Sequence, residues 1–158
     1  MPPNPHDTLA IRNLLALYCL ALDTKDLNQL SQVFTPDVRA SYPFPGGEMH
    51  GLETVQRVIA GRLHAITSQH ALTTQHIALA PSDPPTRASA TTYFSGVHFG
   101  KGQWEGYTCT AYGKYVDELV LVPGVGAETA GASGAWRVCE RRVEFMARVG
   151  EEGIFMRD

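Results

Sequence analysis

The sequence is poor in the features that mark several large functional classes. Among its 158 residues there are only three cysteines, with no CxxC pair, so we expect reduced, buried thiols rather than disulfides. No apolar run approaches the length of a membrane span. A net charge of -3 gives no electrostatic reason to bind nucleic acid or an anionic membrane.

Motifs for cofactors and metals are missing as well. The chain has no P-loop, dinucleotide fingerprint or GxSxG elbow, so we expect no cofactor. The histidines show neither HxH nor HExxH spacing and no accompanying carboxylate pair, so no metal is expected. The N-terminal "MPPNPHD" lacks the basic and apolar regions of a signal peptide, which predicts a cytoplasmic protein.

What is present is an ordinary globular composition, 44% hydrophobic and 18% charged, in which we expect one domain over residues 1–158. Apolar residues first recur at helical spacing and later follow strand-like patterns. Asn4 and Pro5 are a typical cap and first residue of a helix. The expected elements are helices at 5–23, 27–34 and 51–66, a short extended piece near 39–44, and strands at 70–80, 86–100, 104–122 and 135–150.

Helices followed by consecutive long strands indicate an α+β domain with a mostly antiparallel sheet. Strands of this length coil strongly, so the sheet is expected to curve around three covering helices. The pocket would lie between the concave face of the sheet and the helices.

Two polar residues stand out against these patterns. Asp23 ends the first helix, where the helix dipole disfavours a negative charge. Ordinary turn chemistry in "LDTKD" is one explanation. The other is that Asp23 accepts the imidazole N–H of His76, in "TTQHIAL", and so makes it a general base or acid.

Further candidates for the pocket are residues that can polarise a substrate oxygen, Tyr42 and His98. We expect substrate contacts from Leu22, Phe94, Trp104 and Tyr107, while strand parity forbids Trp104 and Tyr107 from both facing inward without a bulge. The remaining histidines have weaker contexts and are interpreted as surface or packing residues: His6, His50, His64 and His70.

Self-association is expected from the outer face of the sheet. Ile77 and Leu79 lie on the side of their strand opposite His76, where they could supply an apolar patch. Burial of that patch would give a homo-oligomer, a dimer or a trimer.

Several segments together resemble the SnoaL-like group of the nuclear-transport-factor-2-like superfamily. They are "Y…ALDTKDLNQLSQVFTPDV", "HG" before the third helix, "TQH", "GKYVDE" and "WRV…R". The resemblance extends over nearly the whole chain. It implies a cone of curved, mostly antiparallel sheet that is closed by helices.

Within this group the sequence is most similar to the scytalone dehydratases. "DTKD" places the catalytic Asp of that family on Asp23, and "TQH" places its paired histidine on His76. The resemblance also carries the pocket tyrosine onto Tyr42 and the second histidine onto His98. The family's second tyrosine is replaced by Leu22, and its pocket asparagine falls near Ala111.

These observations favour a cofactor-free acid–base enzyme, a lyase of the dehydratase type or an isomerase or cyclase. Its substrate would be a small, apolar, oxygenated metabolite resembling a polyketide or terpenoid, as in secondary metabolism. The alternative is a non-catalytic module of the same fold that binds a small molecule or a partner protein.

Overall fold

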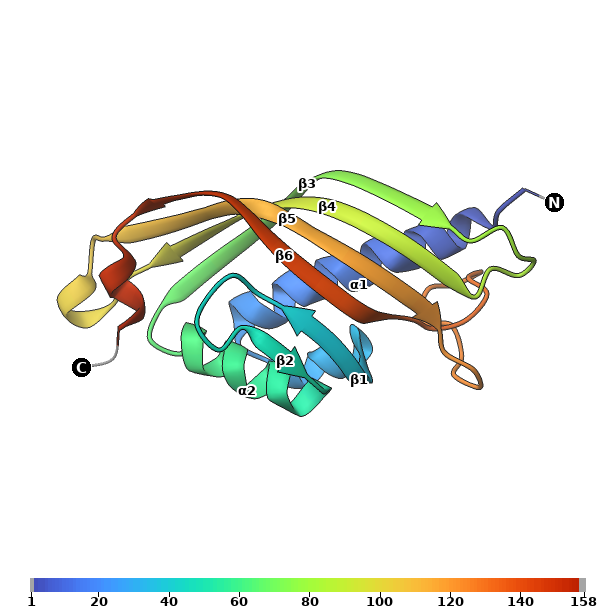
Figure 1. The fold of residues 1–158 in the computed structure, drawn as a ribbon, viewed down its shortest axis with the longest axis horizontal. Coiled ribbons are helices and arrows are strands. Elements are labelled where there is room, and N and C mark those ends of the chain that lie inside the picture. Colours follow the sequence, from blue (N-terminus) through green and yellow to red (C-terminus); the bar gives the residue numbers. More distant parts are fainter. Residues whose placement is uncertain (1, 157–158) are drawn as a thin grey trace.

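The structure is a computed structural model that describes residues 2–156. It is an α+β fold in which one curved sheet arches over the two α-helices (Figure 1). The strand order is β2-β1-β6-β5-β4-β3, and the β1–β6 pair is the parallel one. The elements are α1 (Pro5–Thr24), η1 (Leu27–Gln32), β1 (Phe34–Ser41), β2 (Glu48–His50), α2 (Leu52–Leu63), β3 (Thr67–Leu79), β4 (Arg87–Phe99), η2 (Gly102–Trp104), β5 (Thr108–Leu121), β6 (Trp136–Gly150) and η3 (Glu152–Phe155).

Helix α1 begins as its sequence predicts. Asn4 caps it by accepting a hydrogen bond from the backbone N–H of His6, and Pro5 occupies the first position. The helix ends where Lys25 adopts the left-handed conformation at φ 59°. This end turns the chain beneath the sheet and leaves Asp23, in the last turn, beside the start of β3.

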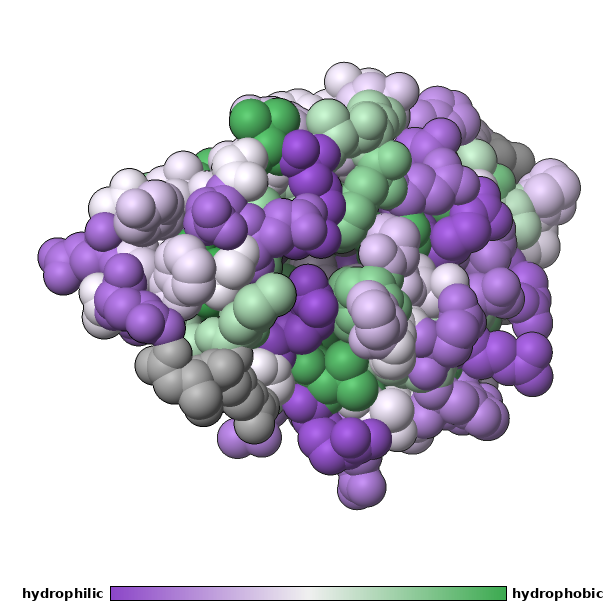
Figure 2. Space-filling view, turned by 60° about the vertical axis from the view of Figure 1, so that its left-hand side comes forward, coloured by the Kyte–Doolittle hydropathy of each residue, from purple (hydrophilic) through white to green (hydrophobic). Residues whose placement is uncertain are grey.

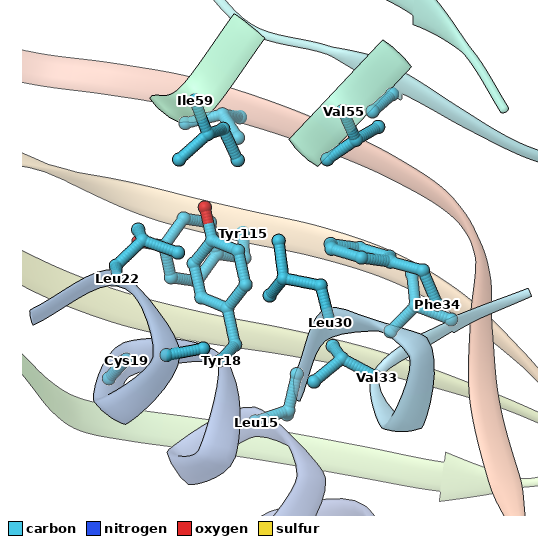
Figure 3. Close-up of a cluster of buried hydrophobic side chains, with 14 of the residues drawn as sticks. Leu15, Tyr18, Cys19, Leu22, Leu30, Val33, Phe34, Val55, Ile59 and Tyr115 are labelled. Carbon is cyan, nitrogen blue, oxygen red and sulfur yellow. The ribbon is translucent and has the colours of Figure 1, made fainter. Parts of the chain in front are cut away.

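The core lies between the concave face of the sheet and α1, η1 and α2. Figure 3 shows Leu15 and Tyr18 of α1 directed towards Leu30 and Val33, with Val55 and Ile59 of α2 on the opposite side. The expected second helix is a short 3-10 helix rather than an α-helix, because Pro36 and β1 follow it at once. The three-helix cover and the antiparallel sheet are otherwise confirmed.

A β-bulge divides β3 into two halves. Leu72 pairs with Phe94 and Gln75 with Thr92, so three steps on β3 match two steps on β4. The extra residue exchanges the two faces of the strand. Beyond the bulge, Ile77 and Leu79 therefore lie on the same face as the buried residues that they pair with, and the expectation that they form an outer patch is wrong.

The outer face of the sheet carries other apolar side chains. Tyr93 and Phe99 of β4 and Tyr112 of β5 are 40%, 42% and 45% exposed. Self-association through this face, in a dimer or a trimer, stays a prediction.

At the end of the molecule that carries the C-terminus, hydrophobic and hydrophilic residues alternate in small groups (Figure 2). Within residues 2–156, none of the helices has the length and apolar character needed to cross a bilayer.

Candidate active site

A cavity opens between α1, α2 and the concave face of the sheet. The space within it that is open to a water-sized sphere's centre is about 70 Å³. Most of its wall is apolar, and the polar groups come from tyrosine, histidine and arginine side chains. The lining residues are Tyr18, Leu22, Tyr42, Phe44, Ile59, Arg62, Leu63, His70, Phe94, His98, Ala111, Tyr115, Val143, Phe145, Arg148 and Phe155.

An Asp–His pair lies at this cavity, and its histidine is His70. The Nδ1 of His70 is 2.7 Å from Oδ1 of Asp23, and the backbone N–H of His70 donates to Oδ2 at 2.8 Å. The hydroxyl of Ser68 also donates to Oδ1 at 2.8 Å. The carboxylate is therefore held by three donors from one strand, and its position fixes the ring of His70.

The electrostatics of the pair favour an ionised carboxylate. Burial raises the pKa of Asp23, but the hydrogen bonds from His70 and Ser68 outweigh it and bring the pKa below its ordinary value. An ionised Asp accepts a proton donor, so the Nδ1 of His70 carries its hydrogen. In the neutral ring Nε2 is then the nitrogen that accepts hydrogen bonds, which is the position a general base needs.

Gly96 makes space for this ring. It pairs with His70 across β3 and β4, and a Cβ at this position would lie 3.0 Å from Cδ2 and 3.1 Å from Nε2 of His70. Any side chain at residue 96 would push the ring away from its present position. The glycine is thus part of what positions the pair.

The predicted Asp23–His76 pair is wrong. His76 is exposed and pairs with Thr91 on the outer face of the sheet. The bulge between Leu72 and Gln75 explains the error, because the extra residue turns His76 outward while His70, before the bulge, points inward. The alternation of apolar and polar residues along the strand does not reveal that it contains an extra, bulged residue.

His98 lies in the cavity as expected, next to His70. The two rings meet edge to face with centroids 5.5 Å apart. The Nδ1 of His98 is 3.0 Å from the carbonyl oxygen of Cys109, so Nδ1 donates and Nε2 is an acceptor. Burial is the main cause that lowers the pKa of His98 to about 4, so the ring is neutral at neutral pH.

Two tyrosines form a hydroxyl pair in the same wall. The hydroxyls of Tyr42 and Tyr18 are 2.7 Å apart. Burial raises the pKa of both phenols, so both keep their protons and can donate hydrogen bonds. Tyr18 lies one helical turn before Leu22, so the wall of the cavity holds a second phenol although residue 22 is a leucine.

Beneath the tyrosines lies a second charged pair, between Arg141 and Asp117. Two hydrogen bonds of 2.7 and 2.8 Å join them, and neither side chain is exposed. The guanidinium carbon lies 4.3 Å from the ring centroid of Tyr18 and 4.2 Å from that of Tyr115. The pair thereby supports the floor of the cavity.

The expected substrate contacts divide into two sets. Leu22 and Phe94 line the cavity, as does Ala111. Trp104 and Tyr107 are outside it, because they precede β5 in the connection that contains η2. Trp104 packs instead against the C-terminal turn, where a Cβ at Gly153 would lie 2.6 Å from its ring.

Functional candidates that the sequence reading missed are His70, Tyr18, Arg62 and Arg148. Tyr18 fitted the apolar stripe of α1, and His70 precedes the bulge that changes strand parity.

In residues 2–156, no three His, Cys, Asp or Glu side chains group closely enough to hold a metal ion.

Comparison with known proteins agrees with this architecture. A family model described as a SnoaL-like domain matches residues 5–142. Comparison with curated proteins found no match.

Among similar solved structures is a protein from Novosphingobium aromaticivorans DSM 12444 provisionally named a scytalone dehydratase. It is 20% identical with a TM-score of 0.73, over 92% of this chain and 87% of that chain. A Kribbella flavida protein is 16% identical with a TM-score of 0.73, over 90% and 93%. A hexachlorocyclohexane dehydrochlorinase (LinA) of type 2 is 12% identical with a TM-score of 0.71, over 96% and 93%.

These structural likenesses establish the fold, and the family match covers most of the chain. The protein belongs to the SnoaL-like domain family and has the nuclear-transport-factor-2-like fold.

Proposed function

We propose that the protein is a cofactor-free acid–base enzyme that eliminates water from a small β-hydroxy carbonyl compound. The observation that carries the proposal is the Asp23–His70 pair, whose bonded Nδ1 leaves Nε2 as a base at the wall of an apolar cavity. Apolar surroundings suit a small, oxygenated metabolite. The names of two structures with this fold, a dehydratase and a dehydrochlorinase, both denote eliminations and agree with this reaction class.

The residues would divide the reaction between them. His70 Nε2 takes the proton from the carbon next to the carbonyl, and Asp23 stabilises the imidazolium that forms. Tyr42 donates its hydroxyl hydrogen to the carbonyl oxygen as it gains negative charge, and Tyr18 donates to the hydroxyl oxygen of Tyr42.

The second half of the reaction returns the proton. The enolate electrons form the new carbon–carbon double bond, and the C–O bond to the β-hydroxyl breaks. The proton held by His70 passes to this hydroxyl, which leaves as water. His98 accepts a hydrogen bond from the hydroxyl and orients it, since its Nε2 has no proton to donate.

The experiment uses a panel of small cyclic ketones with and without a β-hydroxyl, with β-hydroxycyclohexanone as its first member. The panel is incubated in D₂O, and mass spectrometry follows deuterium gain and water loss. We expect both to be catalysed by the wild-type protein. Asp23→Asn should slow both about 10²–10⁴-fold, because an amide can hold the ring in the wrong tautomer.

The binding-module alternative makes the opposite prediction. It requires no deuterium gain and no water loss with any ketone of the panel, although some of these compounds bind. A wild-type rate in a folded Asp23→Asn variant would likewise remove the pair from the mechanism.

A further inference from the structure

Two arginines that the elimination does not use line the same cavity. Arg62 comes from α2 and Arg148 from the end of β6. The lining residues include no Asp or Glu. No carboxylate among the lining residues therefore balances the positive charges of the two arginines.

Arg62 has aromatic neighbours in place of an anionic partner. Its guanidinium carbon lies 3.9 Å from the ring centroid of Phe44 and 5.2 Å from that of Phe155. Within residues 2–156 it makes no side-chain hydrogen bond or ion pair. Stacked rings cover the faces of a guanidinium and leave the N–H groups at its edge free to bind a ligand.

Arg148 is only partly neutralised. Its Nη1 is 3.3 Å from the carboxylate of Glu152, whose side chain is 62% exposed to solvent. Its Nε is buried and, in the described part of the chain, has no hydrogen-bond partner. A buried donor without a partner costs free energy that a ligand oxygen could recover.

The two guanidiniums are electrostatically coupled. Burial lowers the pKa of Arg62, the neighbouring charge of Arg148 lowers it further, and the exposed carboxylate of Glu152 offsets only part of this. Phe155 joins the two, since Arg148 lies 5.5 Å from the same ring. Like charges close together in an apolar wall are relieved by a bound anion.

We propose that Arg62 and Arg148 form a carboxylate-binding subsite, so that the substrate of this cavity is a small organic anion. A carboxylate matches the planar fork of a guanidinium, and its charge would balance the cavity wall. The inference rests on the proposed function because the subsite adjoins the reacting groups. Phe155, which contacts both arginines, also packs edge to face on His98 at 5.0 Å.

The probe is benzoate, compared with benzamide, which has nearly the same shape and no charge. Isothermal titration calorimetry of the wild-type protein should show benzoate binding at least about tenfold more tightly. Arg62→Gln and Arg148→Gln should each reduce benzoate affinity about tenfold and leave benzamide affinity nearly unchanged. Equal wild-type affinities, or no benzoate binding, would overturn the subsite.

Matched variants control for charge and fold. Arg142→Gln removes the same charge from an exposed arginine outside the cavity and should not alter benzoate binding. Glu152→Gln removes the carboxylate that competes with benzoate for Arg148 and should strengthen benzoate binding. Weaker benzoate binding by Glu152→Gln would contradict the proposal, and this arm stays informative if an arginine variant fails to fold.

Asp23→Asn separates the two proposals. It should abolish elimination yet leave the preference for benzoate over benzamide intact, because Asp23 is not among the lining residues. Elimination by the wild-type protein without any preference for benzoate would refute the subsite alone. Preference for benzoate in a wild-type protein that catalyses no elimination would refute the enzyme alone.

Discussion

Two pairs that each join an Asp carboxylate to a nitrogen-bearing side chain lie on the concave side of the same sheet, and their surroundings differ sharply. Asp117 and Arg141 are enclosed, with neither side chain exposed. Asp23 and His70 sit at the cavity, with exposed side-chain fractions of 20% and 7%. The first pair joins a carboxylate to a guanidinium, and the second joins a carboxylate to an imidazole ring, which has a second nitrogen that can accept a proton.

The difference in burial and in partner suits the Asp117–Arg141 pair to a structural role and the Asp23–His70 pair to proton transfer. Burial lowers the pKa of Arg141 but the contacts with Asp117 raise it well above its ordinary value, so the guanidinium stays charged. Such a pair can hold tyrosines in place and cannot exchange protons. The Asp23–His70 pair fixes Nδ1 of the ring and leaves Nε2 without a partner from Asp23 at a cavity, which is the arrangement that proton transfer requires.

The largest expected effect comes from breaking the enclosed pair. Arg141→Met leaves the carboxylate of Asp117 buried without its partner, which should lower the free energy of unfolding by about 3–5 kcal/mol. Urea unfolding measures this. The double variant Asp117→Leu with Arg141→Met should recover most of the loss, and a single variant as stable as the wild type would show that the pair contributes nothing.

Removing the hydroxyl of Tyr42 tests the tyrosine pair above Arg141. Tyr42→Phe should slow water loss from β-hydroxycyclohexanone about 10²-fold, because the carbonyl oxygen loses a donor. Tyr112→Phe is the control, since Tyr112 is 45% exposed on the outer face. Equal rates in the two variants would exclude Tyr42 from oxygen binding.

The neutral ring of His98 predicts a pH dependence of stability. Its pKa is about 4 in the folded protein against an ordinary value of 6.5, so the unfolded chain binds the proton first as pH falls. Stability should be highest above about pH 6.5 and fall by up to about 3 kcal/mol as pH approaches 4. Urea unfolding across this range should show the slope in the wild type and a flatter profile in His98→Gln. A wild-type profile without slope would mean that the pKa of His98 is not lowered in the folded state.

A smaller effect is expected from crowding His70. Gly96→Ala places a Cβ about 3 Å from the ring, which must shift by a few tenths of an ångström. The elimination rate should fall about tenfold, since misplacement of a reacting group weakens catalysis. Gly126→Ala is the control, because a Cβ there meets no atom within 4 Å. Identical rates would show that the ring tolerates the shift.

Much of the fold could be predicted from local patterns. The cap at Asn4, the apolar stripe of α1 and the long strands after Ser68 follow rules that act within a few residues. The unfavourable placement of Asp23 correctly indicated that it has a partner elsewhere in the fold.

The partner itself could not be predicted in the same way. His70 and His76 lie on one strand, and their faces depend on a single extra residue between Leu72 and Gln75. That bulge is set by pairing with β4, not by the strand's own sequence. Tyr18 was equally hidden, because a tyrosine on an apolar stripe looks the same whether its hydroxyl is idle or bonded.

The central claim is that His70, not His76, is the base. The most direct measurement is deuterium exchange into β-hydroxycyclohexanone by His70→Gln and His76→Gln, two identical substitutions six positions apart on β3. Both variants are compared well below their melting temperatures. The account predicts that His70→Gln loses about 10²–10⁴-fold in exchange rate and that His76→Gln keeps the wild-type rate. Wild-type exchange in a folded His70→Gln variant, or a comparable loss in His76→Gln, would contradict it.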